Sequence, residues 1–225
     1  MANSNAILLF GGNSGIGDAL ARGLLKKLNC KVLIRVVRTQ LNSEPNGELV
    51  IQVKKYSDFN YELVKDGYNF RAVIIAFGIL DESKSIGQSM EINLGVNCVE
   101  VIKTLENAVS ASIVKATTEI HYTSSLLADF TRNSVYPYAL SKMITERTIN
   151  KYIEPIHRNL FIWKYAYVQT SLNASRRPSV ISSTLEEVTN LAIEIKKPGS
   201  HYVPRFAKIP SSLLRNLPWL HGYIR

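Results

Sequence analysis

A short apolar run followed by closely spaced glycines constrains the fold of this chain more than any other feature. Residues 6–10 read AILLF, a uniformly apolar run typical of a strand buried on both faces, as in a parallel sheet. Gly11, Gly15 and Gly17 follow, and apolar residues recurring every fourth position then predict a helix. Such a strand, turn and helix N-terminus favour a phosphate site, because free backbone N–H groups and the positive end of the helix dipole face the ligand.

The glycine spacing, Gly-x-x-x-Gly-x-Gly, differs from the commoner Gly-x-Gly-x-x-Gly, and its context after a buried strand gives it its weight. A purely structural glycine-rich turn is the alternative. We expect this turn to contact a nucleotide through Gly11, Asn13, Ser14, Gly15, Ile16 and Gly17.

Strand and helix patterns alternate along the remaining chain with short connections. Strands are expected near residues 32–37, 49–53, 71–77, 119–123, 160–168 and 202–203, and helices near 58–65, 93–115, 134–153 and 186–195. This order predicts an α/β fold, a Rossmann-like doubly wound parallel sheet with helices on both faces in three layers. No linker or repeat interrupts it, so we expect one nucleotide-binding domain over residues 1–225.

The charge balance is basic, with a formal net charge of +9. The basic residues are scattered and not interleaved with aromatic residues, which argues against a nucleic-acid partner. Cys30 and Cys98 match no metal-ligand spacing and are expected to be free thiols, so no metal is predicted. The N-terminal apolar run is too short for a signal peptide, and a cytoplasmic location is the expectation.

The end of the second expected strand bears on the choice of nucleotide. In a dinucleotide site an acid there binds the ribose 2′-hydroxyl of NAD, whereas an arginine accommodates the 2′-phosphate of NADP. Here the strand ends at Arg38 with no acid, which favours NADP(H), with Arg35 as a weaker candidate for the same phosphate. An exposed surface arginine without a ligand is the alternative.

A tyrosine and a lysine four residues apart, Tyr138 and Lys142, open a long apolar-periodic run. On a helix they share one face, where an ammonium favours the ionised form of a phenol. Spacing alone is weak evidence, because Tyr61 and Lys65 have it too. Ser125, thirteen residues before Tyr138, distinguishes the two pairs, since Glu48 occupies that offset before Tyr61.

These residues together resemble the short-chain dehydrogenase/reductase superfamily, in its compact single-domain branch. The resemblance covers residues 5 to about 170 and rests on the glycine turn, Asn93, Ser125 and the Tyr138/Lys142 pair in that order. Two motifs depart from the family pattern: its Asn-Asn-Ala-Gly reads Ile75-Ala76-Phe77-Gly78, and its Pro-Gly reads Tyr165-Ala166.

The resemblance implies an oxidoreductase that interconverts a carbonyl and an alcohol by hydride transfer with a nicotinamide. Tyr138 would be the proton donor, Lys142 would lower its pKa and hold the nicotinamide ribose, and Ser125 would bind the developing oxyanion. Asn93 would kink its helix and anchor a water molecule beside Lys142. Gly78 and Thr170 would contact the cofactor, and the protein would be a homo-oligomer.

The C-terminal segment from about residue 204 is basic and amphipathic, with prolines that divide it into short pieces. It is expected to cover the substrate pocket, to form a dimer contact, or to lie on a membrane surface. Residues 171–183 are candidates for a lid over the pocket, together with Tyr167. A nucleotide-binding regulator of the same fold with weak or no catalysis is the alternative to the enzyme.

Overall fold

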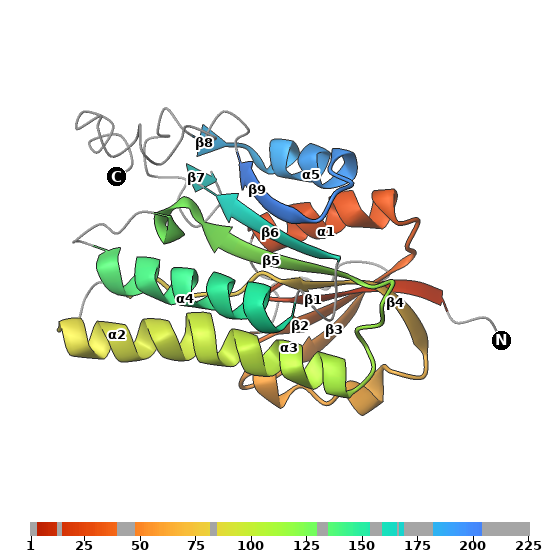
Figure 1. Cartoon of the computed structure of the whole chain (residues 1–225). Helices are drawn as coiled ribbons and strands as arrows, with labels where there is room; N and C mark the ends of the chain where they lie inside the picture. The colour runs from red at the N-terminus through yellow and green to blue at the C-terminus, as the bar shows by residue number, and fades with distance from the viewer. Residues whose placement is uncertain are drawn as a thin grey trace.

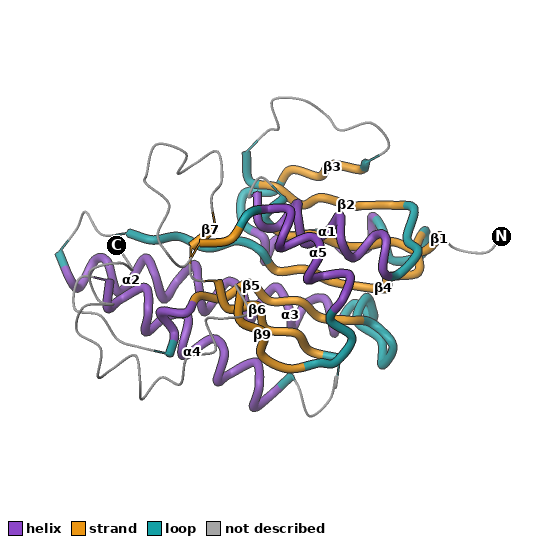
Figure 2. Tube along the Cα trace, turned by 90° about the horizontal axis from the view of Figure 1, so that it is seen from above, coloured by secondary structure: helices purple, strands orange, loops and turns teal. Residues whose placement is uncertain are grey.

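The computed structural model describes residues 4–12, 15–39, 48–81, 85–129, 135–153, 159–165, 167–168 and 182–203. Its main element is a seven-stranded sheet in the order β3-β2-β1-β4-β5-β6-β9, in which every pair of neighbours is parallel. Figure 2 shows this order from the β3 edge to the β9 edge. The strands are β1 (Ser4–Phe10), β2 (Val32–Val37), β3 (Leu49–Gln52), β4 (Tyr68–Ile75), β5 (Glu119–Ser125), β6 (Leu160–Tyr165) and β9 (Gly199–Val203). A separate short pair is formed by β7 (Tyr167–Val168) and β8 (Ser182–Ser183).

Helices cover both faces of the sheet and make three layers (Figure 1). On one face lie α1 (Gly15–Lys27) and α5 (Leu185–Glu194); on the other lie α2 (Ile86–Leu94), α3 (Val101–Ser110) and α4 (Tyr136–Tyr152). The predicted doubly wound α/β fold is confirmed. No helix within the described ranges is long and apolar enough to cross a membrane.

The apolar run of β1 supplies both halves of the hydrophobic core. Ala6, Leu8 and Phe10 join the cluster that packs beneath α3 and α4, whereas Ile7 and Leu9 join the cluster beneath α1 and α5. Successive side chains of a strand point to opposite faces, so a strand between two helical layers must be apolar at every position. The sequence pattern therefore located this strand correctly.

The long helix begins earlier than the sequence pattern indicated. It was expected over residues 93–115, but α2 begins at Ile86, continues through a π-helical segment (Gly95–Glu100) and joins α3, which ends at Ser110. The buried positions of α2 are Ser89 and Asn93, which are polar, so this part has no apolar stripe that a periodicity argument could find.

The short helix expected at residues 58–65 is replaced by two 3-10 turns, Tyr56–Asp58 and Tyr61–Leu63. Phe59 and Tyr61 are both buried in the cluster around Phe10. Residues two apart cannot share one face of an α-helix, so the packing of these two rings excludes a continuous helix there.

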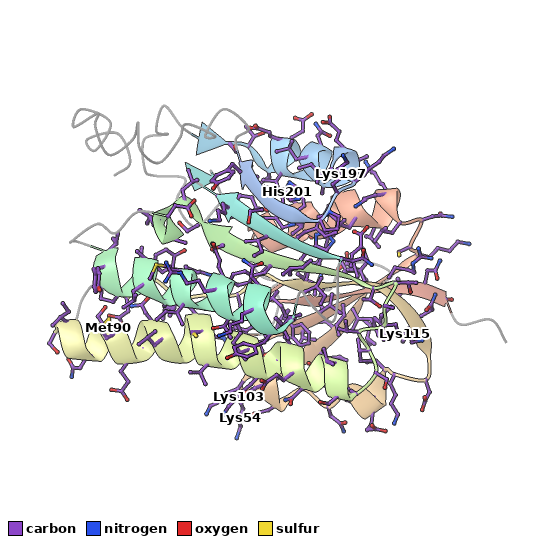
Figure 3. All side chains as sticks on the ribbon, viewed as in Figure 1. Lys54, Met90, Lys103, Lys115, Lys197 and His201 are labelled. Atoms are coloured by element: carbon purple, nitrogen blue, oxygen red, sulfur yellow. The ribbon has the colours of Figure 1, made fainter. Side chains whose placement is uncertain are left out.

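Most of the described basic residues are spread over the surface, as their scatter in the sequence suggested, and three of them are buried. Lys54, Lys103, Lys115 and Lys197 are all exposed. Figure 3 shows Lys54 and Lys103 close together in the view beneath α3, with Lys115 and Lys197 at separate places near the ends of α3 and α5.

Candidate active site

The glycine turn after β1 packs against the end of β4. Gly11 has a φ of 90° and donates its N–H to the Val36 carbonyl at 3.1 Å. A Cβ added at Gly11 would lie 2.7 Å from the backbone of Ala76 and Phe77. Both the positive φ and this close approach require glycine. The turn then leads into α1, whose first turn contains Gly15, Ile16 and Gly17.

The buried side chain of Arg35 contacts the glycine turn and holds it in place. Arg35 on β2 donates to the Gly12 carbonyl at 3.0 Å and forms ion pairs with Asp18 of α1 and with Glu48. Burial raises the pKa of Asp18, but hydrogen bonds from Arg22 and Arg35 outweigh it and leave that pKa below its ordinary value. The guanidinium of Arg35 is therefore committed to protein carboxylates. Arg35 was predicted only as a weaker candidate for the 2′-phosphate, so this role is a correction.

Arg38 lies just beyond the end of β2 and is exposed. Its guanidinium stands 5.3 Å from the centroid of the Tyr56 ring, and that ring stacks on Phe77 with centroids 4.1 Å apart. These three side chains therefore stack on one another at the carboxyl ends of β2 and β4. A cation over an aromatic face is held without losing its contact with solvent.

Ser125, Tyr138 and Lys142 are brought together at the carboxyl end of β5. Ser125 is the last residue of the strand, and its hydroxyl hydrogen-bonds the half-buried Tyr138 in the first turn of α4. The Lys142 ammonium donates to the Thr123 carbonyl at 3.2 Å and lies 5.9 Å from the centroid of the Tyr138 ring. Three of the four predicted catalytic residues therefore form one cluster.

The electrostatics of this cluster differ from the expectation that Lys142 lowers the pKa of Tyr138. Burial raises the pKa of Tyr138 above its ordinary value, and the hydrogen bond from Ser125 only partly opposes this shift. Burial also lowers the pKa of Lys142 to about 8, with Glu146 acting in the other direction. In this state the phenol is protonated at neutral pH, as a proton donor must be.

Asn97, rather than Asn93, is the asparagine that reaches this cluster. The Asn97 amide accepts from the Ile79 N–H and donates to the Ile79 carbonyl, both at 2.8 Å, and it donates to the Ser141 hydroxyl at 3.0 Å. Asn93 lies one turn earlier and donates to the Ser89 carbonyl at 2.8 Å and to the Asp81 carbonyl at 3.2 Å. The two side chains meet at 3.3 Å.

Asn97 was missed because the motif that carried the resemblance ends before it. The π-helical segment Gly95–Glu100 contains Asn97, and its backbone carbonyl accepts from Thr145 of α4 at 2.7 Å. π-Helical segments are frequent at functional sites, but a single sequence gives no sign of them. Two asparagines spaced four apart were the only available signal.

Gly78 closes the cluster from the side of β4. A Cβ at this position would lie 2.8 Å from the Asn97 Oδ1 and 3.1 Å from the Lys142 Nζ. The glycine predicted to approach a cofactor therefore also leaves room for the lysine and the asparagine. Asn13, Ser14, Thr170 and the segment from residue 204 lie outside the described residues, as does all of 171–181.

Comparisons with known proteins support the fold that these residues suggested. A short chain dehydrogenase from Burkholderia cenocepacia in complex with NADP superposes with a TM-score of 0.74 at 17% identity, covering 99% of this chain and 97% of its own. This chain has the short-chain dehydrogenase/reductase fold. A 3-oxoacyl (acyl-carrier-protein) reductase from Agrobacterium tumefaciens with NADP bound gives a TM-score of 0.70 at 15% identity, covering 89% and 93% of the two chains.

A third structure with this fold contains the other nicotinamide dinucleotide. It is a 3-oxoacyl-[acyl-carrier protein] reductase from Brucella melitensis in complex with NAD, with a TM-score of 0.68 at 13% identity and coverage of 86% and 90%. No protein-family model matches the sequence, and no curated protein does. The resemblance is therefore carried by the arrangement of the short-chain dehydrogenase/reductase fold and by the few residues placed at its carboxyl edge.

Proposed function

We propose that this protein is a short-chain dehydrogenase/reductase that interconverts a carbonyl and an alcohol with NADP(H). The observation that carries the proposal is the cluster of Ser125, Tyr138 and Lys142 at the carboxyl edge of a parallel sheet. Ligands of such sheets bind at this edge.

The residues at this edge fit a nicotinamide dinucleotide. Gly11 brings the turn against the end of β4, and the N-terminus of the 13-residue helix α1 faces the carboxyl edge as a site for the pyrophosphate. Gly78 leaves the space beside Lys142 open. When bound, the nicotinamide supplies or accepts the hydride, and the protein contributes orientation and proton management.

Arg38 is our candidate for the 2′-phosphate of NADP(H). Arg35 is neutralised by Asp18 and Glu48, so it has no free charge for a ligand, whereas Arg38 is exposed and pairs with an aromatic ring. We infer a preference for NADP(H) over NAD(H) from the Arg38 guanidinium and from the absence of an acidic residue at the end of β2 in the sequence. Replacing Arg38 by Ala should weaken NADPH binding and leave NADH binding unchanged; equal weakening of both would contradict the assignment.

Tyr138 donates the proton to the carbonyl oxygen in the reductive direction. Burial keeps its hydroxyl protonated, and Ser125 stands beside it to bind the oxygen as its charge develops. Lys142 supplies the positive charge of the cluster and would hold the cofactor ribose. Asn93 remains a predicted member of the set, and Asn97 holds Ile79 and Ser141 next to it.

The substrate is a small molecule with a carbonyl or alcohol, and we infer a homo-oligomer in the cytoplasm as the working form. Contact of the C-terminal segment with a membrane surface stays a secondary proposal. The alternative function, a regulator that binds the nucleotide without turnover, draws its support from Phe77 and Tyr165 in place of smaller family residues. Tyr165 is buried, and its hydroxyl has no hydrogen-bond partner among the described residues.

The test is a screen of NADPH oxidation against ketones, sugars and acyl thioesters, repeated with Tyr138→Phe. Loss of the proton donor should reduce turnover by at least about a thousandfold and leave nucleotide binding intact. Tyr61→Phe is the matched control, since Tyr61 belongs to the other pair with the same spacing. Retained turnover in Tyr138→Phe would end the enzymatic mechanism, and binding without turnover in the unmodified protein would favour the regulator.

A further inference from the structure

A third ionisable residue continues the line of Tyr138 and Lys142 along α4. Glu146 follows Lys142 by four residues, so the three side chains lie on one face of the helix, one turn apart. The Glu146 side chain is only 10% exposed. A carboxylate at such a depth requires partners for both oxygens.

Both oxygens of Glu146 have partners on the sheet. Lys164 on β6 lies 2.8 Å from its Oε2, and the Ser124 hydroxyl donates to its Oε1. Lys164 also forms an ion pair with Asp129. Ser124 directly precedes Ser125, so the end of β5 contacts α4 twice: through Ser125 at Tyr138 and through Ser124 at Glu146.

Lys164 occupies a position that the strand otherwise fills with apolar residues. Leu160 and Ile162 point to the same face of β6 and join the core beneath α4, whereas Lys164 brings a charge into this layer with 7% of its side chain exposed. A buried ion pair is weak evidence for stability, because apolar residues of similar volume often do as well or better. The pair therefore calls for a reason other than stability.

We infer that Lys164 and Glu146 are positioning residues of the proposed active site: Lys164 keeps Glu146 ionised, and the charge of Glu146 keeps Lys142 protonated beside Tyr138. This inference rests on the proposed function only for the role of Tyr138. The electrostatic coupling itself depends on the geometry of α4, β5 and β6.

The charges around Lys142 and Glu146 support this order of action. Burial lowers the pKa of Lys142, and the negative charge of Glu146 opposes that shift. The centroid of the Tyr122 ring on β5 lies 5.1 Å from the Lys142 ammonium. Burial raises the pKa of Glu146, hydrogen bonds from Lys164 and Ser124 oppose the shift, and the charge of Asp129 adds to it.

The remaining neighbours of this network are ionisable groups from three other elements. They act on Lys164, on Glu146 or on Tyr122. Tyr202 of β9 lies 5.6 Å below the Lys164 ammonium, Asp129 follows β5, and Cys98 of the π-helical segment acts on Tyr122.

The experiment reads the titration of Lys142 directly, without turnover. Protein labelled with ¹³C at lysine is titrated by NMR, and the Lys142 signal is assigned by its loss in Lys142→Arg. In Lys164→Met the Glu146 carboxyl should take up a proton, and the pKa of Lys142 should fall by roughly one unit because an opposite charge is lost. If Lys164 acted on Lys142 directly, removing its positive charge would raise that pKa instead.

Glu146→Gln gives a second route to the same result, should Lys164→Met fold poorly. It removes the carboxylate charge and keeps an oxygen for Ser124 and Lys164, and the pKa of Lys142 should fall by a similar amount. Adding Lys164→Met to Glu146→Gln should then produce no further fall. Additive effects, or an unchanged or raised pKa of Lys142 in either single variant, would overturn the inference.

Lys27→Met is the matched control, because Lys27 is also a mostly buried lysine in an ion pair, with Glu119 at 3.1 Å on the opposite face of the sheet. It should leave the Lys142 titration unchanged, and Lys164→Arg should restore it. A shifted titration in a protein without any turnover would refute the proposed function alone; normal turnover with no shift would refute this inference alone.

Discussion

The chain contains two tyrosine–lysine pairs of identical spacing, and the structure places them in different surroundings. Tyr61 is buried on a 3-10 turn, and its hydroxyl donates to the Thr104 carbonyl at 2.9 Å; burial raises its pKa. Lys65 is bound by the neighbouring Glu62, which raises its pKa. The Tyr61 ring packs against Phe10 and Phe59 in the hydrophobic core beneath α3 and α4.

Tyr138 and Lys142 have the same spacing on a true α-helix whose first turn abuts the end of β5. Tyr138 is bonded to a hydroxyl, which can accept or donate, rather than to a fixed backbone carbonyl. The pKa of Lys142 is lowered to about 8, opposite in direction to that of Lys65. The same spacing therefore brings a phenol and an ammonium together only where the backbone is helical. Their position in the fold then decides whether they face a ligand.

The largest expected effect that separates the pairs is the pH dependence of stability. The folded-state pKa of Lys142, about 8, is below its ordinary value of 10.5, so between these two pH values the unfolded state binds more protons than the folded state. Lys142 should therefore cost stability below pH 8, on the order of 3 kcal/mol, and the cost should disappear as the pH rises toward 10.5.

The measurement compares the free energy of unfolding of Lys142→Met with that of the unmodified protein from pH 7 to pH 10. Relative to the unmodified protein, the variant should be most favoured at pH 7 and lose that advantage as the pH rises. Lys65→Met supplies the control, because Lys65 is only half-buried and has a raised pKa. A pH-independent difference between Lys142→Met and the unmodified protein would show that Lys142 is not desolvated.

A smaller effect is expected from filling the space beside Lys142. Gly78→Ala places a Cβ 2.8 Å from the Asn97 Oδ1 and 3.1 Å from the Lys142 Nζ, so one of the two must move. Displacing a catalytic group by about 1 Å costs on the order of a hundredfold in turnover, and we expect a loss of that size in kcat.

Gly87→Ala is the control for that substitution, since a Cβ there meets nothing within 4 Å. It lies on α2 and should leave turnover unchanged and stabilise the helix slightly. Full turnover in Gly78→Ala would mean that the Lys142 ammonium and the Asn97 amide can shift without loss of activity. The difference between Lys142 and Lys65 would then rest on their pKa shifts alone.

The sequence was sufficient for the parts of the fold that follow from periodicity. The parallel sheet and the glycine turn were located, because apolar strands leave patterns that a single chain displays. Helix α4 was also located, from the run that begins at the Tyr138/Lys142 pair, although its buried positions are mostly polar. Ser125, Tyr138 and Lys142 were found by spacing together with order along the chain. These predictions needed no knowledge of which atoms touch.

What the sequence could not supply depends on buried polar contacts. Ser89 and Asn93 hid the start of α2, and the role of Asn97 depends on a π-helical segment that no pattern indicates. Arg35 was the weaker candidate for the 2′-phosphate and is instead bonded to the glycine turn and to Asp18. Lys164 interrupts an apolar face of β6, and a role for it can be inferred only from its ion pair with Glu146, which the sequence does not reveal. A buried polar residue is defined by its partner, which lies far away in the sequence.

The smallest expected effect concerns Tyr61 and tests the structural half of the comparison. Tyr61→Phe removes the hydroxyl that donates to the Thr104 carbonyl and leaves that buried acceptor without this donor. The free energy of unfolding should fall by about 1 kcal/mol, the usual net worth of one hydrogen bond, while nucleotide binding and turnover stay unchanged. Chemical denaturation measures the first and a steady-state assay the second. The Tyr61 ring would still pack edge-on against Phe59, with centroids 4.8 Å apart. A much larger loss of stability would therefore mean that the hydroxyl itself fixes the 3-10 turn. A loss of turnover would instead place Tyr61 in the active site and remove the contrast between the two tyrosine–lysine pairs.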